Sequence, residues 1–187
     1  MTDADTLATY YDEDYYGQGT GKFIWPVEKL IHLSRLLRAK AIQRYVAKGR
    51  VLDVGCGRGL TLKYLKDRGY EVDGVELDTV AAERASDTLA QDIFRTLENV
   101  RERGALQYEA VCFWHSLEHL PDPGKALETA DSLLVPGGLL VIAAPHMEGL
   151  PSRLSGQSWL HLDMPRHLVH FDMKSLPAFM TNKGYRL

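Results

Sequence analysis

The sequence predicts an α/β fold built on a doubly wound, mostly parallel sheet with helices on both faces. Short apolar runs typical of buried strands alternate along the chain with segments of helical periodicity. One of these runs leads directly into a glycine-rich turn, VGCGRG, at residues 54–59. Strands that alternate with helices imply crossover connections, which place helices on both faces of a parallel sheet.

A chain of 187 residues has the length of one domain. We expect a single domain, 1–187, in four parts. These are an arm (1–24), an N-terminal helix (25–48), an α/β core (50–145) and a closing loop with a helix (146–187).

Charge and cysteine content restrict the class of partner and the compartment. The net charge of −3 gives no general attraction to nucleic acid. The N-terminus lacks a basic start, and no apolar run reaches the length of a membrane span. Cys56 and Cys112 fall in apolar surroundings and are expected to be reduced thiols. We therefore expect a cytoplasmic protein without export or a membrane span.

The N-terminal quarter contains an arm and a helix. Residues 1–24 are rich in tyrosine, aspartate and glycine, and two interpretations stay open, a lid over a ligand and an acidic tail. From Trp25, apolar residues at steps of three and four predict an amphipathic helix. Its expected core face is Val27, Leu30, Leu33, Leu37, Ala41 and Tyr45. The basic residues between them, Arg35 and Arg38 included, are expected to be solvated.

The remaining elements follow in order along the chain. Buried or alternating apolar runs predict strands at 50–54, 71–77, 109–114 and 137–145. A weaker pattern predicts one more strand at 88–91. Helical spacing and glycine or proline stops predict the helices. These are expected at 60–68, briefly from Thr79, at 94–103 and at 125–134.

The glycine turn has the character of a ligand site. Glycines between a strand and a helix let a ligand approach the backbone, and the helix N-terminus behind them offers unpaired N–H groups. Glu76 ends the second strand about 20 residues further on, where a carboxylate can accept both hydroxyls of a ribose. Together these features favour a ligand that contains a nucleoside.

Two nucleoside ligands compete for this turn. Dinucleotide oxidoreductases carry GxGxxG, whereas this chain has Leu60 in place of the third glycine. Asp53, two positions before the first glycine, can hold an ammonium group and would repel a pyrophosphate. S-adenosylmethionine combines an ammonium group, a ribose and an adenine, so it fits the pattern better than NAD.

At this point the sequence resembles a known family. The segments VLDVGCGRG, VDGVELD, SLEHLPDP and LLVPGGLLVIAAP, in this order, look like a class I S-adenosylmethionine-dependent methyltransferase. WLHLDMPRHLVHF (159–171) and the tyrosine-rich start are similar to the group with ubiquinone-biosynthesis-type and sugar methyltransferases. The resemblance implies a Rossmann-like fold in which the C-terminal hairpin of strands 6 and 7 is missing. An exposed fifth-strand edge would then allow a homodimer.

The resemblance also implies roles for individual residues. Asp53 and the turn glycines would line the methionine end of the cofactor, Glu76 would take the ribose, and Leu77 would cover the adenine. Asp92 would meet the adenine amino group, and Trp114 and His115 would lie near the transferable methyl. The cofactor-binding residues are thus expected to be Asp53, Gly55, Gly57, Gly59, Glu76, Leu77, Asp92, Trp114 and His115.

The histidines HSLEH (115–119) fit the HxxEH pattern of one group of zinc peptidases. A strand ends at Trp114, and Pro121 and Pro123 leave room for about one helical turn, so no metal site is expected. For His119 two interpretations stay open: a core histidine hydrogen-bonded in its loop, or a catalytic residue that faces the acceptor.

A second histidine cluster lies in 159–171, where the resemblance places an active-site loop. His167, like His119, is a candidate base for removing a proton from the acceptor. Tyr16, His161 and Arg166 are candidates for acceptor binding. For Arg166 a structural clamp with Asp163 is the alternative.

The expected function is methyl transfer from S-adenosylmethionine to a small-molecule acceptor by direct in-line displacement, without a covalent intermediate. Whether oxygen, nitrogen or carbon is methylated stays open, and nucleic acid is disfavoured as a partner. The alternatives are a catalytically incomplete module that binds S-adenosylmethionine, and a nicotinamide-dependent oxidoreductase.

Overall fold

The computed structural model describes residues 25–104, 106–145, 168–169, 171–172 and 174–186. Its sheet has the strand order β2-β1-β3-β4, and every neighbouring pair is parallel. The strands are β1 (Arg50–Val54), β2 (Glu71–Val75), β3 (Tyr108–Trp114) and β4 (Leu134–Ala143). The predicted α/β class with a parallel sheet is confirmed.

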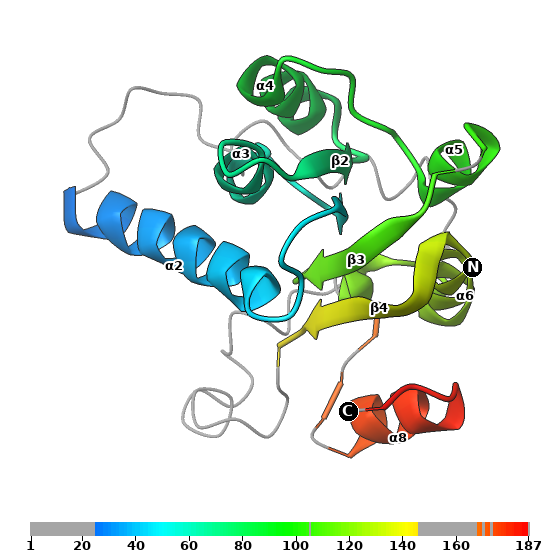
Figure 1. Cartoon of the computed structure of the whole chain (residues 1–187). Helices are drawn as coiled ribbons and strands as arrows, with labels where there is room; N and C mark the ends of the chain where they lie inside the picture. Colours follow the sequence, from blue (N-terminus) through cyan, green and yellow to red (C-terminus); the bar gives the residue numbers. More distant parts are fainter. Residues whose placement is uncertain (1–24, 105, 146–167, 170, 173, 187) are drawn as a thin grey trace.

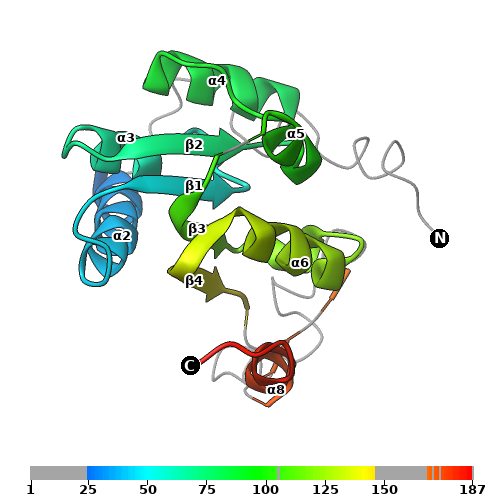
Figure 2. The ribbon, with the colours of Figure 1, turned by 45° about the vertical axis from the view of Figure 1, so that its right-hand side comes forward.

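The strands bury residues alternately on the two faces of the sheet, as a period of two requires. Val51 and Ala110 belong to a core cluster on one face, whereas Leu52 and Val111 belong to a cluster on the other face. Helices α2 (Trp25–Gln43) and α3 (Leu60–Lys66) cover the first face. Helices α5 (Leu97–Glu102) and α6 (Pro123–Leu133) cover the second (Figures 1 and 2). The sheet is therefore doubly wound.

Short polar side chains set the starts of three helices. Asp78 accepts a hydrogen bond from the Ala81 amide at the start of α4 (Thr79–Leu89). Thr96 does the same for α5, and Asp122 does so for α6, whose first residue is Pro123. The one-turn helix η1 (Leu117–His119) separates β3 from α6, and α8 (Ser175–Asn182) buries Met180 against the second face.

The prediction of a strand at 88–91 is wrong. These residues form the last turn of α4 and its cap, because Ala90 adopts a left-handed conformation with φ of 50° and ends the helix. The extended contact comes later, where Phe94 forms an isolated parallel bridge with Val75 at the outer edge of β2. The predicted helix at 94–103 correspondingly begins only at Leu97, after the Thr96 cap.

The prediction for the first helix is also wrong in its end and its face. α2 ends at Gln43 rather than near residue 48, and it buries Ala39 and Ile42, followed by Val46. The small Ala39 lets this face approach α3 and the sheet closely. The large side chains expected in the core between Leu30 and Tyr45 are exposed instead. Their exposed fractions are 66% for Leu30, 48% for Leu33, 55% for Leu37 and 71% for Tyr45.

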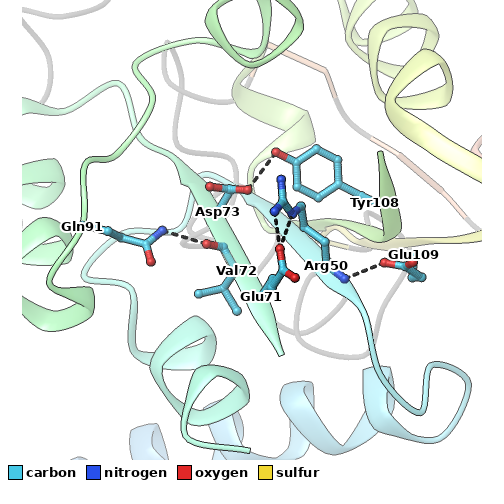
Figure 3. A network of polar contacts seen from close by, with 7 residues as sticks. All are labelled: Arg50, Glu71, Val72, Asp73, Gln91, Tyr108 and Glu109. Carbon is cyan, nitrogen blue, oxygen red and sulfur yellow. Dashed lines mark hydrogen bonds and ion pairs between the residues drawn. The ribbon is translucent and has the colours of Figure 1, made fainter. Parts of the chain in front are cut away.

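A polar network ties together the amino ends of three strands (Figure 3). The Tyr108 hydroxyl donates to Asp73 at 3.0 Å, reaching from β3 across β1 to β2. Arg50 forms an ion pair with Glu71, and its backbone amide donates to Glu109. The carboxyl ends of the strands lie at the opposite edge of the sheet, away from this network.

Candidate cofactor site

The candidate site lies where the order of the sheet reverses. β1 connects through α3 to β2 on one side, whereas β3 on the other side of β1 connects through α6 to β4. Ligands of open α/β sheets bind at such a switch point, outside the carboxyl ends of the strands. Residues that follow Val54 and Phe113, which are partners in the register of β1 and β3, therefore face one crevice.

The glycine turn wraps around the end of β2. The amides of Gly55 and Cys56 both donate to the Val75 carbonyl, at 2.8 and 3.0 Å. Gly55 has φ of 76°, and a Cβ atom there would lie 2.6 Å from the Cβ of Ser116. Gly57 also has a positive φ, 56°, but a Cβ there would meet nothing within 4 Å. Gly55 is thus required for close packing, whereas Gly57 borders open space that a ligand can fill.

The Glu76 side chain, which follows β2, is hydrogen-bonded to the backbone of the glycine turn. Its Oε2 accepts a hydrogen bond from the Gly57 amide at 2.8 Å, and its Oε1 accepts one from the Asp78 amide at 3.0 Å. Burial raises the pKa of this carboxyl, and the two backbone hydrogen bonds oppose the rise. A carboxylate offers about four acceptor positions, so Glu76 can still accept hydroxyl groups of a ligand.

A cavity of about 140 Å³ opens beside the turn. It has room for the amino-acid end of a ligand rather than for a whole nucleoside. The turn, the first residues of α3 and one face of α2 form its walls. The lining residues are Arg35, Arg38, Asp53, Gly55, Cys56, Gly57, Arg58, Leu60 and Thr61.

Opposite charges meet in this cavity. Asp53 is 4% exposed, and its Oδ1 has no hydrogen-bond partner among the described residues. Burial raises the pKa of Asp53 to about 7, while Arg38 and Arg35 favour its charged form. Burial and the neighbouring Arg38 and Arg58 lower the pKa of Arg35. The cavity therefore offers one acceptor for a cation and a cluster of arginines for an anion.

Sequence reasoning missed Arg35 and Arg38, which it assigned to the solvated face of the first helix. The guanidinium of Arg38 lies 5.3 Å from the centre of the Trp114 ring, so it joins α2 to the end of β3. One signal was present in the sequence: Arg35, Arg38, Ala39 and Ile42 recur at helical steps. The long leucine repeat on the opposite face concealed it.

The turn after β3 borders the same crevice. The Ser116 hydroxyl donates to the Val54 carbonyl, and the His115 amide donates to the Ala143 carbonyl at 2.7 Å. His115 has φ of 57°, and its Nδ1 lies 3.7 Å from Oε1 of the buried Glu118. His119 is half-buried at the end of η1, so the expected single helical turn in HSLEH is confirmed.

The remaining predicted residues are more scattered. Gly59 is the N-cap of α3, Leu77 is 51% exposed after β2, and Asp92 is exposed between α4 and α5. Asp92 does not line the cavity described above. Tyr16, His161, Arg166 and His167 lie outside the described residues, so their roles stay predictions.

Two features are absent from the described residues. They contain no group of three histidine, cysteine, aspartate or glutamate side chains arranged to hold a metal ion. No helix in that part of the chain has the length and apolar character needed to cross a membrane.

The site fits the amino-acid end of S-adenosylmethionine. That end carries an ammonium group, which can donate a hydrogen bond to the unpaired Oδ1 of Asp53, and a carboxylate, which the arginines can bind. The open space at Gly57 admits the adjoining chain of the ligand. The fold and the site together define an α/β protein with a ligand site at the switch point of its sheet, where the glycine turn meets Asp53 and the arginines.

Comparisons with known proteins identify the family. A family profile described as "Methyltransferase domain" matches residues 28–187, most of the chain. The chain therefore belongs to this methyltransferase family. It is 33% identical over 112 residues to a ubiquinone biosynthesis O-methyltransferase of Psychrobacter cryohalolentis, a match that covers 56% of this chain and 44% of that protein. For the enzyme of the same name from Xanthomonas axonopodis, identity is 29% over 153 residues, with 75% and 64% covered.

Solved structures agree with the fold. A SAM-dependent methyltransferase from Archaeoglobus fulgidus is 25% identical, with a TM-score of 0.63 and coverage of 81% of this chain and 69% of that one. The plantazolicin methyltransferase BpumL in complex with SAH has a TM-score of 0.68 at 18% identity, covering 97% and 70%. The chain spans about half the length of the curated relatives it matches, 44% in the Psychrobacter case.

Proposed function

We propose that this chain binds S-adenosylmethionine at the glycine turn and transfers its methyl group to a small molecule. The observation that carries the proposal is the pairing of charges in the cavity, where Asp53 lies beside Arg35, Arg38 and Arg58. A ligand with both an ammonium group and a carboxylate satisfies both sides at once, which neither a simple cation nor a simple anion can do.

Each part of the cofactor has a partner in this arrangement. The arginines bind the carboxylate, Asp53 binds the ammonium group, and Glu76 accepts the ribose hydroxyls. Leu77, exposed after β2, covers the adenine. When bound, the cofactor supplies an electrophilic methyl group. The protein then has to align the acceptor with that methyl and keep water out.

The acceptor that the relatives suggest is a hydroxyl group of a small molecule. Curated relatives of this chain are named as O-methyltransferases of ubiquinone biosynthesis. His119 and His167 remain candidate bases for a hydroxyl, and Tyr16, His161 and Arg166 remain candidate contacts for the acceptor. We also propose that the chain forms a single domain, is located in the cytoplasm and assembles as a homodimer. Light scattering tests the homodimer.

The test is transfer of a labelled methyl group. The purified chain is incubated with methyl-labelled S-adenosylmethionine and a panel of catechols, phenols and sugars, and labelled products are separated from the cofactor. Asp53→Ala and Glu76→Ala serve as site variants, and Glu71→Ala, at the far end of β2, serves as the matched control. Labelled product that both site variants abolish supports the proposal. Cofactor binding with no product from any acceptor supports the binding-module alternative instead.

A further inference from the structure

We propose that His115 is the base that accepts the acceptor's proton, and that Glu118 is a positioning residue that orients its ring. The inference rests on the proposed function, because it assigns the proton transfer within that reaction. It gives His115 a catalytic role in place of the cofactor contact expected from the sequence, and it assigns to His115 the role of base for which His119 and His167 are the candidates from the sequence.

The backbone fixes where His115 can point. With φ of 57°, His115 is one of two residues other than glycine that have a positive φ in the described part of the chain. Such a conformation is strained and persists only where the surroundings impose it. Here the hydrogen bond from the His115 amide to Ala143 and the bond from Ser116 to Val54 impose it. The turn thus holds the histidine at the carboxyl ends of β1, β3 and β4.

Glu118 supplies the second observation. Its side chain is almost fully buried, at 1% exposure, and neither carboxylate oxygen has a hydrogen-bond partner among the described residues. Among the described residues, its ion-pair contact is with His115, whose Nδ1 lies 3.7 Å from Glu118 Oε1. Leaving a buried carboxylate unpaired is costly, so a small rotation of the imidazole that closes this gap is favoured. Amides of Leu168 and Val169 donate to the Glu118 carbonyl and hold this residue in place.

This pairing decides which ring nitrogen is the base. A carboxylate only accepts hydrogen bonds, so Nδ1 carries the proton and Nε2 of the neutral ring keeps its lone pair. The His115 side chain is 46% exposed, which leaves Nε2 open to a ligand. The neighbours of His115 reach the crevice, since Trp114 contacts the cavity arginine Arg38 and Ser116 packs on Gly55.

The reaction step then balances. A lone pair of the acceptor oxygen forms a bond to the methyl carbon, and the carbon–sulfur bond breaks with its electron pair going to sulfur. Nε2 takes the hydroxyl proton, and the Glu118 carboxylate stabilises the resulting imidazolium. The proton later passes from Nε2 to water, which restores the neutral ring.

The direct test is the tautomer of His115, measured by nitrogen-15 NMR on the full chain with labelled histidine. The resonance is assigned by its loss in His115→Gln. In the neutral ring of the wild type we expect the Nδ1–H tautomer. In Glu118→Leu we expect the Nε2–H tautomer that free histidine prefers. Glu128→Leu, which removes an exposed carboxylate of α6, should leave the tautomer unchanged.

Each result decides the inference. An Nε2–H tautomer in the wild type overturns it without any variant, even if Glu118→Leu does not fold. So does an Nδ1–H tautomer that persists in a folded Glu118→Leu. With a methyl acceptor in hand, His115→Gln should lower kcat by about 10²–10⁴-fold and the affinity for S-adenosylhomocysteine far less. Failure to bind S-adenosylhomocysteine would instead contradict the proposed function and leave the tautomer result standing.

Discussion

The carboxylate of Glu76 is joined to the backbone amide of Gly57 by a hydrogen bond of 2.8 Å, so the end of β2 supports the turn that follows β1. Glu76→Ala removes this support together with the proposed ribose acceptor. We expect the affinity for S-adenosylhomocysteine to fall by at least roughly tenfold, as loss of a charge-assisted hydrogen bond predicts. Calorimetric titration measures it. Glu71→Ala, which removes the ion pair with Arg50 at the other end of β2, should bind as the wild type does.

Asp53 gives the site a dependence on pH. Its pKa rises from 3.8 to about 7 because the carboxyl is buried, so the folded state favours the protonated form. As the pH rises from 3.8 to about 7, the wild type therefore loses stability relative to Asp53→Asn. Above about pH 7 the full cost of burying the charged carboxylate is present. At about pH 8 we expect Asp53→Asn to be more stable by on the order of 1–3 kcal/mol. Urea unfolding at several pH values checks this, and equal pH profiles would contradict it.

The same residue predicts a pH dependence of binding with the opposite preference. An ammonium group of the ligand pairs with the charged form of Asp53, so the affinity for S-adenosylhomocysteine should decrease as pH falls below about 7. In Asp53→Asn the affinity should be weaker throughout and lack that dependence. Titrations of both proteins between about pH 5.5 and 7.5 measure the effect. A variant that keeps the wild-type slope would place the titrating group elsewhere.

The arginines should recognise one part of the ligand only. Arg35→Leu and Arg38→Leu remove partners of the amino-acid carboxylate, and we expect each to weaken S-adenosylhomocysteine by about 10-fold. 5′-Methylthioadenosine lacks that carboxylate, so its weaker binding should not change. Arg44→Leu, an exposed arginine just after α2, is the matched control. Equal losses for both ligands would show that the arginines act on the fold and not on the carboxylate.

Two glycines of the turn should respond differently to alanine. Gly55→Ala places a Cβ 2.6 Å from Ser116, so we expect a loss of several kcal/mol of stability, of the size that overpacking causes. In Gly57→Ala the added Cβ meets no neighbour within 4 Å. The only loss of stability expected is that of a left-handed backbone at alanine, roughly 1–2 kcal/mol. Its methyl group projects into the proposed ligand space. A folded Gly57→Ala that binds S-adenosylhomocysteine at full affinity would count against the site.

Sequence reasoning succeeded where the constraint is local. The alternation of strands and helices, the glycine turn and the acid after β2 depend on periodicity and spacing, and the structure places Asp53 and Glu76 around one turn. It failed where two local patterns compete. The leucines of α2 have a perfect helical period, yet Ala39 and Ile42 are the side chains that pack. The choice depends on how closely α2 can approach α3, which no single helix encodes.

Two further features depend on the tertiary structure alone. The strand expected at 88–91 is instead the end of a helix, because Ala90 caps α4. The contact with β2 is made by Phe94. In the sequence, His115 and Glu118 are part of a segment that fits the HxxEH pattern of one group of zinc peptidases. Only the positive φ of His115 and the burial of Glu118 reveal the contact between the two side chains.

The most direct test of the central claim is a titration of the labelled chain with S-adenosylhomocysteine, followed by backbone amide NMR. The account predicts saturable shifts at residues 55–60, at Glu76 and Leu77, and at Trp114 and His115. Amides at the amino ends of the strands, Arg50, Glu71 and Tyr108, should stay in place because they lie at the opposite edge of the sheet. No saturable shift in the folded protein, or shifts confined to the amino ends, would contradict a cofactor site at the glycine turn.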